Sequence, residues 1–476
     1  MWEFNNKEKI ALYQDDGKTL SYGQLDKEVE SLFKHINRRC LCFILTTNTI
    51  GSIISYVTCL KKRVVPALIS RNLDVTMLDT LIQNYRPAFI MAPLNMKDDI
   101  YKLDVFRDGK LESIYEFSDY VLFSSGFIED AKLYDDLALL LTTSGSTGSP
   151  KFVRQSYINI ESNTKSIIEY LKIDDKERAI TTLPMNYTYG LSIINTHLQA
   201  GASLLLTDKT LMQKGFWDFF KQEKATSFGG VPYTYEMLDK LKVYKMDIES
   251  LKTMTQAGGK LTPELHEKFA KFAENTGRNF VVMYGQCEAT ARMAYLPADQ
   301  AVLKKGSMGI AIPGGSFKLI DEKGQQITTP HTTGELVYEG ANVTLGYAST
   351  LSDLSKGDER NGILYTGDMA QFDEDGYYYI VGRKKRFLKI YGNRVNLDEV
   401  DRLIKGKFET EVACAGVDDC MYIFLTDKAI ASEVAKFVSE KTRLNPAAFK
   451  TVVIDEIPKN DAGKTTYKEL EKYYDV

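Results

Sequence analysis

A loop of glycine and hydroxyl residues is the stretch of the sequence best suited to binding phosphate. Residues 142–151 read Thr-Thr-Ser-Gly-Ser-Thr-Gly-Ser-Pro-Lys, and they follow an apolar run, residues 137–141, whose length suits a buried strand. Glycine lets the backbone approach a ligand closely, and consecutive N–H groups form a nest of positive partial charge. The hydroxyls add donors, and Lys151 adds a full charge. The loop therefore indicates a polyphosphate ligand, with a flexible surface linker as the alternative.

Four further motifs carry residues suited to binding a ligand. They are residues 187–190 (Tyr-Thr-Tyr-Gly), 258–259 (Gly-Gly), 284–288 (Tyr-Gly-Gln-Cys-Glu) and 365–368 (Tyr-Thr-Gly-Asp). Aromatic side chains beside a glycine suit the wall of a flat or apolar ligand, and paired glycines let a planar ring lie close to the backbone. Each motif also has a plainer interpretation, as ordinary aromatic packing or as a turn.

Composition indicates a soluble protein of more than one domain. The chain has 476 residues, of which 44% are hydrophobic and 26% charged, and its net charge is −4. No long basic run occurs, so the charge does not suggest a nucleic-acid partner. The most apolar stretch, around residues 50–60, is too short to span a bilayer and ends in three cations.

The N-terminus, the cysteines and the histidines indicate a cytoplasmic protein without a histidine-based site. The first residues lack an export signal. None of the six cysteines forms a Cys-x-x-Cys pair, so we expect reduced thiols that are mostly buried. The four histidines are widely spaced, which argues against a histidine metal site or a Ser-His-Asp triad.

The elements that must position these motifs alternate between helix and strand. We expect a helix from about residue 21 to residue 36, capped by Ser21, and short buried strands at residues 41–45, 64–69 and 88–91. Another helix is expected at residues 159–171, after the glycine loop. Such alternation favours an α/β fold with layered sheets and parallel strands. Short strands and turns across residues 305–345 predict a small β-rich subdomain.

The motifs together resemble the acyl-adenylating superfamily of acyl- and aryl-CoA synthetases and carrier-protein acid ligases. The segment Thr-Ser-Gly-Ser-Thr-Gly-Ser-Pro-Lys at residues 143–151 resembles the signature of that superfamily, and six ordered motifs from Leu20 to Lys464 agree with it. The resemblance implies ATP and Mg²⁺ as cofactors. The residues that it places at the nucleotide are Thr143, Ser144, Gly145, Ser146, Thr147, Gly148, Lys151, Gly258, Gly259, Tyr284, Gly285, Asp368 and Arg383.

The same resemblance assigns roles to individual side chains. Tyr284 would stack on adenine, Glu288 would help to hold Mg²⁺, and Asp368 would bind the two ribose hydroxyls. Tyr187 and Gly190 would line the acid pocket. Cys287 departs from the usual threonine, and a thiol is a weaker donor than a hydroxyl, although Thr290 is a candidate to replace it.

The resemblance also implies a mobile C-terminal lid. We expect an N-terminal adenylate-forming domain at residues 1–384 and an α+β lid at residues 385–476, with Lys385 as the hinge. Lys464, in the segment Pro-Lys-Asn-Asp-Ala-Gly-Lys, matches the catalytic lysine of acid activation. Lys389 is expected at the AMP phosphate in the second, thiol-transferring conformation.

The implied reaction is activation of a carboxylic acid as acyl-AMP and transfer to a thiol, from CoA or from the pantetheine of an acyl carrier protein. Two alternatives stay open. One is an amino-acid-activating carrier-protein ligase, but Gly190 stands where a carboxylate would hold the substrate ammonium, and a buried ammonium without such a partner is costly. The other is a catalytically inactive nucleotide-binding regulator.

Overall fold

The chain divides into two compact units. The computed structural model describes residues 2–107, 109–127, 132–142, 151–391, 393–442, 444–459 and 465–474, and for residues 385, 387, 389, 393 and 394 it describes only the backbone. The first unit comprises the described parts of residues 1–143, 150–316 and 338–364, and the second comprises those of residues 317–337 and 365–476. The boundary predicted near Lys385 stays a prediction.

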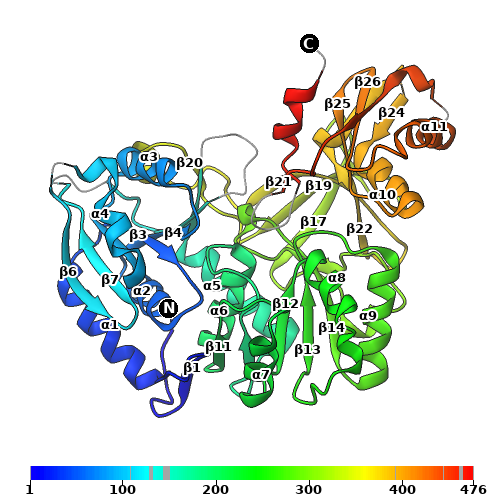
Figure 1. Ribbon diagram of the computed structural model, residues 1–476. Helices are drawn as coiled ribbons and strands as arrows, with labels where there is room; N and C mark the ends of the chain where they lie inside the picture. Colours follow the sequence, from blue (N-terminus) through cyan, green and yellow to red (C-terminus); the bar gives the residue numbers. More distant parts are fainter. Residues whose placement is uncertain are drawn as a thin grey trace. The chain divides into compact units, whose positions relative to one another are not determined.

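One sheet of the first unit is built around four parallel strands and has eight strands in the described part of the chain (Figure 1). Its order is β20-β9-β8-β4-β3-β5-β7-β6. The bounds are Gly346–Ala348 (β20), Phe152–Ser156 (β9), Leu137–Thr142 (β8), Val65–Ser70 (β4), Leu41–Thr46 (β3), Phe89–Pro93 (β5), Tyr120–Ser124 (β7) and Glu112–Phe117 (β6). Strands β8, β4, β3 and β5 run parallel, whereas the outer strands pair antiparallel.

The second sheet of this unit also has a parallel centre, and the described residues give it nine strands. Its order is β16-β15-β14-β13-β12-β10-β11-β1-β2. The bounds are Ile310–Ala311 (β16), Ala294–Tyr295 (β15), Asn279–Tyr284 (β14), Thr253–Gln256 (β13), Ser227–Gly230 (β12), Arg178–Ile180 (β10), Ser203–Leu206 (β11), Ile10–Gln14 (β1) and Thr19–Ser21 (β2). Strands β14, β13, β12, β10, β11 and β1 are parallel, so their carboxyl ends lie along one edge. Ligands of open α/β sheets bind outside that edge.

Helices cover both sheets and share a core with them. The helices of the first unit are α1 (Tyr22–Ile36), α2 (Ile50–Lys61), α3 (Val75–Tyr85), α4 (Lys97–Tyr101), α5 (Tyr157–Leu171), α6 (Thr188–Gln199), α7 (Lys214–Gln222), α8 (Pro232–Lys240) and α9 (Pro263–Thr276). One hydrophobic cluster contains Leu68 of β4, Leu204 of β11, and Leu25, Ile160 and Leu191 of helices α1, α5 and α6. The two sheets and the helices between them therefore form a layered α/β unit, as predicted.

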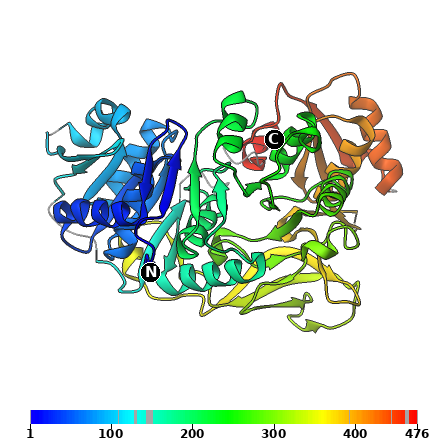
Figure 2. The ribbon, with the colours of Figure 1, turned by 90° about the horizontal axis from the view of Figure 1, so that it is seen from below.

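Most of a five-stranded sheet belongs to the second unit, and Figure 2 shows its strands together in yellow-green. Within the described residues its order is β18-β17-β19-β21-β22. The bounds are Gln326–Ile327 (β18), Gly315–Ile320 (β17), Gly334–Gly340 (β19), Ile363–Phe372 (β21) and Tyr378–Arg383 (β22). This sheet corresponds to the predicted β-rich subdomain.

The C-terminal part of the second unit is a small α+β arrangement. It contains the hairpin β23 (Phe387–Ile390) and β24 (Asn393–Asn396) and the three-stranded sheet β25 (Val412–Val417), β26 (Cys420–Leu425) and β27 (Phe449–Val453). Helices α10 (Leu397–Phe408) and α11 (Ala431–Thr442) pack on one face, through Ile404 and Val434 among others. Alternate residues of the strands, Tyr422 and Phe424 among them, pack with Leu470 in a separate cluster.

Local signals placed most elements correctly. Ser21 caps α1 through a reciprocal capping box, because its hydroxyl accepts from Gln24 N at 3.2 Å while its own N–H donates to the Gln24 side chain at 2.8 Å. The expected strands at residues 41–45, 64–69 and 88–91 correspond to β3, β4 and β5. All six cysteines are free thiols, and four of them are buried, as expected.

Candidate active site

Several predicted site residues follow the carboxyl ends of neighbouring parallel strands. Residues 258 and 259 follow β13, and Tyr284 ends β14 with Gly285 directly after it. Tyr187 stands immediately before α6, in the connection that begins at the end of β10. The fold therefore brings the acid-pocket and adenine candidates of the first unit to one edge of the nine-stranded sheet.

Gly258 and Tyr187 are in direct contact. Gly258 has φ of +86°, and a Cβ there would lie 2.7 Å from the Tyr187 hydroxyl and 3.1 Å from Val231. A side chain at this position would be strained and would displace the Tyr187 ring. Burial raises the pKa of the Tyr187 phenol, so the phenol stays neutral. The pair forms a wall of backbone and aromatic ring.

Gly190 has a packing role that the sequence did not reveal. A Cβ at this position in the first turn of α6 would overlap the carbonyl oxygen of Pro184. The helix therefore approaches the preceding connection closely, and an aspartate at residue 190 would not fit. The absence of a carboxylate at residue 190 thus has a physical cause in the packing of the helix.

The segment after β14 folds back tightly on itself. A Cβ at Gly285 would overlap the carbonyl oxygen of Ala291, and Met293 N donates to Tyr284 O at 2.8 Å. Gln286 Nε2 donates to the Tyr284 hydroxyl at 3.3 Å. The Thr290 hydroxyl is buried and donates to Asn342 O at 2.7 Å, so it is already engaged and does not replace a threonine at residue 287.

Glu288 is held by a residue distant in sequence. The Tyr347 hydroxyl donates to Glu288 Oε1 at 2.6 Å, and the Arg360 guanidinium stacks 4.6 Å from the centre of the Tyr347 ring. Tyr347 lies on β20, which pairs with β9 directly after the glycine loop, so that Tyr347 is opposite Val153. This pairing brings the Glu288 carboxylate to the strand that follows the loop and its exposed Lys151.

A fully buried arginine, Arg154, fixes the segment that carries Tyr347. Its Nε donates to Tyr347 O at 3.0 Å, and its terminal nitrogens donate to Leu345 O and Gly357 O at 3.2 Å each. It also pairs with the Glu359 carboxylate. Arg154 therefore determines where Tyr347 stands, although it does not contact Glu288 itself.

The glycine loop is framed by adjacent strands. Strands β8 and β9 pair antiparallel, with Thr142 opposite Phe152, so residues 143–150 connect their neighbouring ends. Those residues, including Thr143, Ser144, Gly145, Ser146, Thr147 and Gly148, lie outside the described part of the chain. The helix predicted at residues 159–171 corresponds to α5, whereas strand β9, between the loop and this helix, was not predicted.

Asp368 and Arg383 meet in the second unit. They are partners on β21 and β22, and Arg383 Nε lies 3.2 Å from Asp368 Oδ1. Asp368 is buried, whereas Arg383 is exposed. Two residues that were predicted separately to contact the nucleotide therefore form one ion pair.

The hinge and lid residues are partly described. Lys385 lies in a short 3₁₀ turn, Lys384–Arg386, and Lys389 lies on β23, but only their backbones are described; Lys464 lies outside the described residues. Arg386, next to Lys385, pairs with Asp398 and Asp401 at 2.8 Å each and stacks 3.7 Å from the Tyr467 ring centre. Arg386, next to Lys385, is thus in contact with Tyr467, which lies three residues after Lys464.

A family model described as "AMP-binding enzyme" matches residues 2–348, which is most of the chain. The chain belongs to this AMP-binding enzyme family. Among curated relatives, the peroxisomal OPC-8:0-CoA ligase 1 of Arabidopsis thaliana is 31% identical over 71% of this chain, and the oxalate–CoA ligase of the same plant is 28% identical over 71%. The matches span 64% and 68% of the lengths of those two relatives.

Solved structures of family members share the fold of the whole chain. The o-succinylbenzoate CoA synthetase of Bacillus subtilis in complex with its acyl-adenylate intermediate has a TM-score of 0.78 at 22% identity, covering 98% of this chain and 95% of that chain. An ATP-bound MatB chimera has a TM-score of 0.80 at 22% identity, covering 100% and 97%. The α/β fold and the acyl-adenylating superfamily predicted from the sequence are confirmed.

The described residues are compatible with Mg²⁺ that is bound mainly through the phosphates of ATP. Within the described ranges, no group of three or more His, Cys, Asp and Glu side chains is placed to hold a metal ion. Mg²⁺ is usually bound through one or two carboxylates, with substrate phosphates and water completing its shell. Glu288, exposed to solvent in part and held by Tyr347, is the candidate for one such carboxylate.

The sequence did not reveal the residues that hold Glu288 and the segment around it in place. Tyr347, Arg154 and Arg360 were assigned no role. The sequence around Arg154, Phe-Val-Arg-Gln-Ser, is too polar to indicate that this arginine is buried and needs a partner.

The helices in the described ranges include none with the length and apolar character needed to cross a membrane.

Proposed function

We propose that this protein activates a carboxylic acid with MgATP to form acyl-AMP and pyrophosphate, and then transfers the acyl group to the thiol of CoA. The observation that carries the proposal is the Glu288–Tyr347 pair beside the strand that follows the glycine loop. Membership of the AMP-binding family supports it, and the names of the relatives, which are CoA ligases, favour CoA over a carrier protein.

In the activation step, the carboxylate oxygen of the acid attacks the α-phosphorus of ATP, and the bond to the β-phosphate oxygen breaks. The loop at residues 143–151 would hold the leaving pyrophosphate, and Glu288 would hold Mg²⁺, which neutralises charge on the phosphates. Tyr284, Gly258 and Gly259 would enclose adenine, and Asp368 with Arg383 would bind the ribose. Lys464 would stabilise the charge that develops at the reacting oxygens.

In the transfer step, the thiol attacks the acyl carbon and AMP leaves with the electrons of the acyl–oxygen bond. Activation is needed because a carboxylate is a poor acceptor for a thiol. We propose that the lid at residues 385–476 turns about Lys385 between the two steps and brings Lys389 to the AMP phosphate. The cytoplasmic location expected from the sequence remains a prediction.

A pyrophosphate-release assay tests the proposal. A panel of acids is supplied with ATP and Mg²⁺, with and without CoA, to wild type and to Glu288→Gln. We expect pyrophosphate with particular acids, acyl-CoA and AMP when CoA is present, and strongly reduced rates in the variant. Release that depends on an α-amino group would favour amino-acid activation instead. If the protein binds ATP but no acid in the panel gives pyrophosphate, the result would favour a nucleotide-binding regulator.

A further inference from the structure

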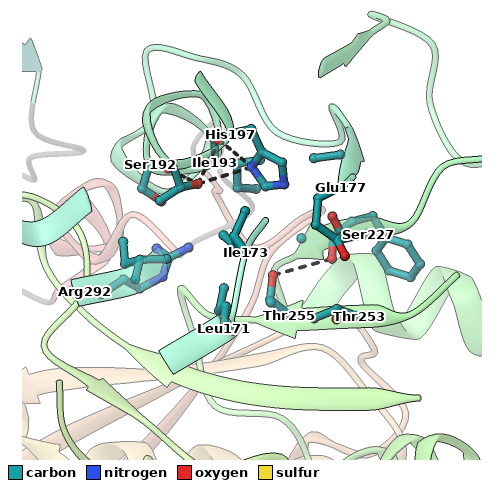
Figure 3. A pocket seen from close by; sticks show the side chains of 15 residues that line it. Leu171, Ile173, Glu177, Ser192, Ile193, His197, Ser227, Thr253, Thr255 and Arg292 are labelled. Atoms are coloured by element: carbon teal, nitrogen blue, oxygen red, sulfur yellow. Dashed lines mark hydrogen bonds between the residues drawn. The ribbon is translucent and has the colours of Figure 1, made fainter. Parts of the chain in front are cut away.

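A small cavity inside the first unit is separate from the proposed acid site (Figure 3). Its volume is about 30 Å³, which is room for two or three water molecules. Tyr187, Gly190 and Gly258 are not among the described residues that line it, whereas the Glu177 carboxylate and His197 are. His197 Nε2 is buried and has no hydrogen-bond partner among the described residues, and a water molecule would satisfy it. We expect water, and no substrate group, in this cavity.

A buried arginine of the second unit, Arg386, directly follows the proposed hinge residue Lys385. Its guanidinium donates from Nε to Asp398 Oδ1 and from a terminal nitrogen to Asp401 Oδ2, at 2.8 Å each. The other terminal nitrogen donates to Cys414 O. Acceptors on helix α10 and strand β25 therefore fix the plane of the guanidinium and leave its face for an aromatic ring.

The aromatic ring on that face belongs to Tyr467. The ring centre of Tyr467 lies 3.7 Å from Arg386 Cζ, and the Tyr467 hydroxyl donates to Asp401 Oδ2 at 3.3 Å. Burial raises the pKa of the Tyr467 phenol, so the hydroxyl stays protonated and remains a donor. A cation–π contact away from water is stronger than one at an exposed site. Tyr467 is thus held to Arg386 by its ring and to Asp401 by its hydroxyl.

Tyr467 also lies at the base of the segment that carries Lys464. Lys464 is outside the described residues, but the two ends of the segment, residues 459 and 465, are described. Lys459 and Thr465 form an isolated antiparallel β-bridge. Neighbouring Cα atoms are about 3.8 Å apart, so covalent geometry keeps Lys464 next to this bridge. The base of the segment is therefore anchored in the lid, two residues before the tyrosine that contacts Arg386.

The two arms of this segment pack in the core of the lid as well. Ile457 before the segment and Leu470 after it belong to one hydrophobic cluster, together with Phe424 of β26. These contacts hold the arms to the sheet, whereas Tyr467 connects the base of the segment to the turn at Lys385. Loss of the Tyr467 ring should therefore loosen the base without unfolding the lid.

We propose that Tyr467 is a positioning residue: by stacking on Arg386, it holds the segment that carries Lys464 in a fixed place relative to the hinge turn. This role rests on the proposed function, in which the lid turns about Lys385 and Lys464 must reach the reacting oxygens. A displacement of about 1 Å, even when it is caused far from the reacting atoms, can slow a reaction strongly. The contact therefore matters for the activation step, which uses Lys464, and not for the transfer step, which does not use it.

The test measures the two half-reactions separately in Tyr467→Leu. ATP–pyrophosphate exchange with an accepted acid reports activation, and thioester formation from supplied acyl-AMP and CoA reports transfer. We expect exchange to fall by about tenfold, because leucine cannot stack on Arg386, and transfer to change by less than about twofold. Tyr467→Phe keeps the ring and loses one hydrogen bond of 3.3 Å, so it should keep most of the exchange activity.

Tyr474→Leu is the matched control. Tyr474 is a partly buried tyrosine of the same C-terminal segment, but its ring stacks on that of Tyr422, with 4.6 Å between the ring centres. Its loss should affect the two half-reactions equally and weakly. An equal loss of both half-reactions in Tyr467→Leu, no loss of exchange, or the same selective loss in Tyr474→Leu would overturn the role of Tyr467. Should Tyr467→Leu not fold, Tyr467→Met, whose flexible side chain fills irregular gaps, takes its place with the same expected results.

Limited proteolysis with trypsin separates this role from the proposed function, because it needs no substrate. Trypsin cleaves after lysine, so cleavage between Lys464 and Thr465 reports opening of the β-bridge at the base of the segment. We expect this cleavage to be about three- to tenfold faster in Tyr467→Leu than in wild type, because a partly buried cation–π contact is lost, and unchanged in Tyr474→Leu. If no acid gives pyrophosphate exchange in wild type, the proposed function fails, but faster cleavage of Tyr467→Leu would still support the anchoring by Tyr467. Equal cleavage rates in wild type and Tyr467→Leu would overturn it.

Discussion

The hydroxyl of Tyr347 donates to the carboxylate of Glu288 at 2.6 Å, although 59 residues separate the two along the chain. A hydrogen bond to a charged acceptor both orients and stabilises it. The proposed Mg²⁺ ligand is therefore held in place before any nucleotide binds, by a residue that pairing between β20 and β9 brings to the site.

Loss of this hydrogen bond should weaken the use of MgATP. We expect Tyr347→Phe to lower kcat/KM for MgATP by about three- to tenfold, the value of one hydrogen bond of ordinary strength. Measuring the rate as Mg²⁺ is varied checks the cause, since the defect should shrink at high Mg²⁺. Tyr101→Phe is a suitable control, because Tyr101 is exposed to a similar degree, 43% against 41%, and lies outside the proposed site. An equal loss in both variants would contradict the role of Tyr347.

Arg154 should contribute strongly to the stability of the protein. We expect Arg154→Met to lower the free energy of unfolding by about 3 kcal/mol, because several buried carbonyl groups lose their donor together. Glu359→Gln should cost less than about 1 kcal/mol, since the Glu359 side chain is half exposed and is solvated without its partner. Urea unfolding of the two variants measures both values, and equal losses would show that the ion pair, not the carbonyl contacts, holds the segment.

Gly285 and Gly406 should respond in opposite ways to the same substitution. A Cβ at Gly285 would overlap Ala291 O, so Gly285→Ala must shift the backbone beside the adenine candidates and should sharply reduce ATP binding. Gly406 lies inside α10 with open space around it, so Gly406→Ala should stabilise the protein by about 0.5–1 kcal/mol. ATP titration and thermal unfolding measure the two effects. A Gly285→Ala variant that binds ATP normally would refute the close approach.

Lys464 should be required for one half-reaction only. We expect Lys464→Ala to lower acid-dependent pyrophosphate exchange by about 100- to 1000-fold, as for other contacts that stabilise transition-state charge. Thioester formation from supplied acyl-AMP should be largely spared, because by then the pyrophosphate has already left. Equal effects on the two half-reactions would remove Lys464 from the proposed role.

Acid should destabilise the protein through His197 before its carboxylates titrate. Burial lowers the pKa of His197 below its ordinary 6.5, so below pH 6.5 the unfolded chain binds a proton that the folded chain does not. The stabilisation is fully present above pH 6.5 and is lost as pH falls toward the lowered pKa. His266, whose pKa burial also lowers, acts in the same direction.

The measurement is Tm as a function of pH from neutral down to about pH 5, above the range in which ordinary carboxylates titrate. His197→Asn should flatten the fall in Tm, and adding His266→Asn should flatten it further. A slope that is the same in wild type and in the double variant would contradict the assignment.

Much of the fold followed from local sequence. Helix α1 was predicted with its cap because the capping box of Ser21 and Gln24 involves residues three apart. Strands β3, β4, β5 and β8 were predicted because each is a short, continuous apolar run. The family and the glycine loop were also recognisable from sequence, because a motif of contiguous residues needs no knowledge of what lies opposite it.

The partners of the site residues were decided by tertiary structure alone. The Glu288–Tyr347 hydrogen bond and the Arg154–Glu359 ion pair both depend on which strands and segments pack together. Hydrogen bonds and ion pairs act over a few ångströms, whereas these residues are separated by tens to hundreds of positions in sequence. The sequence by itself determined which elements and motifs the protein has, because these depend on neighbouring residues. Chain packing determined which distant side chains became partners.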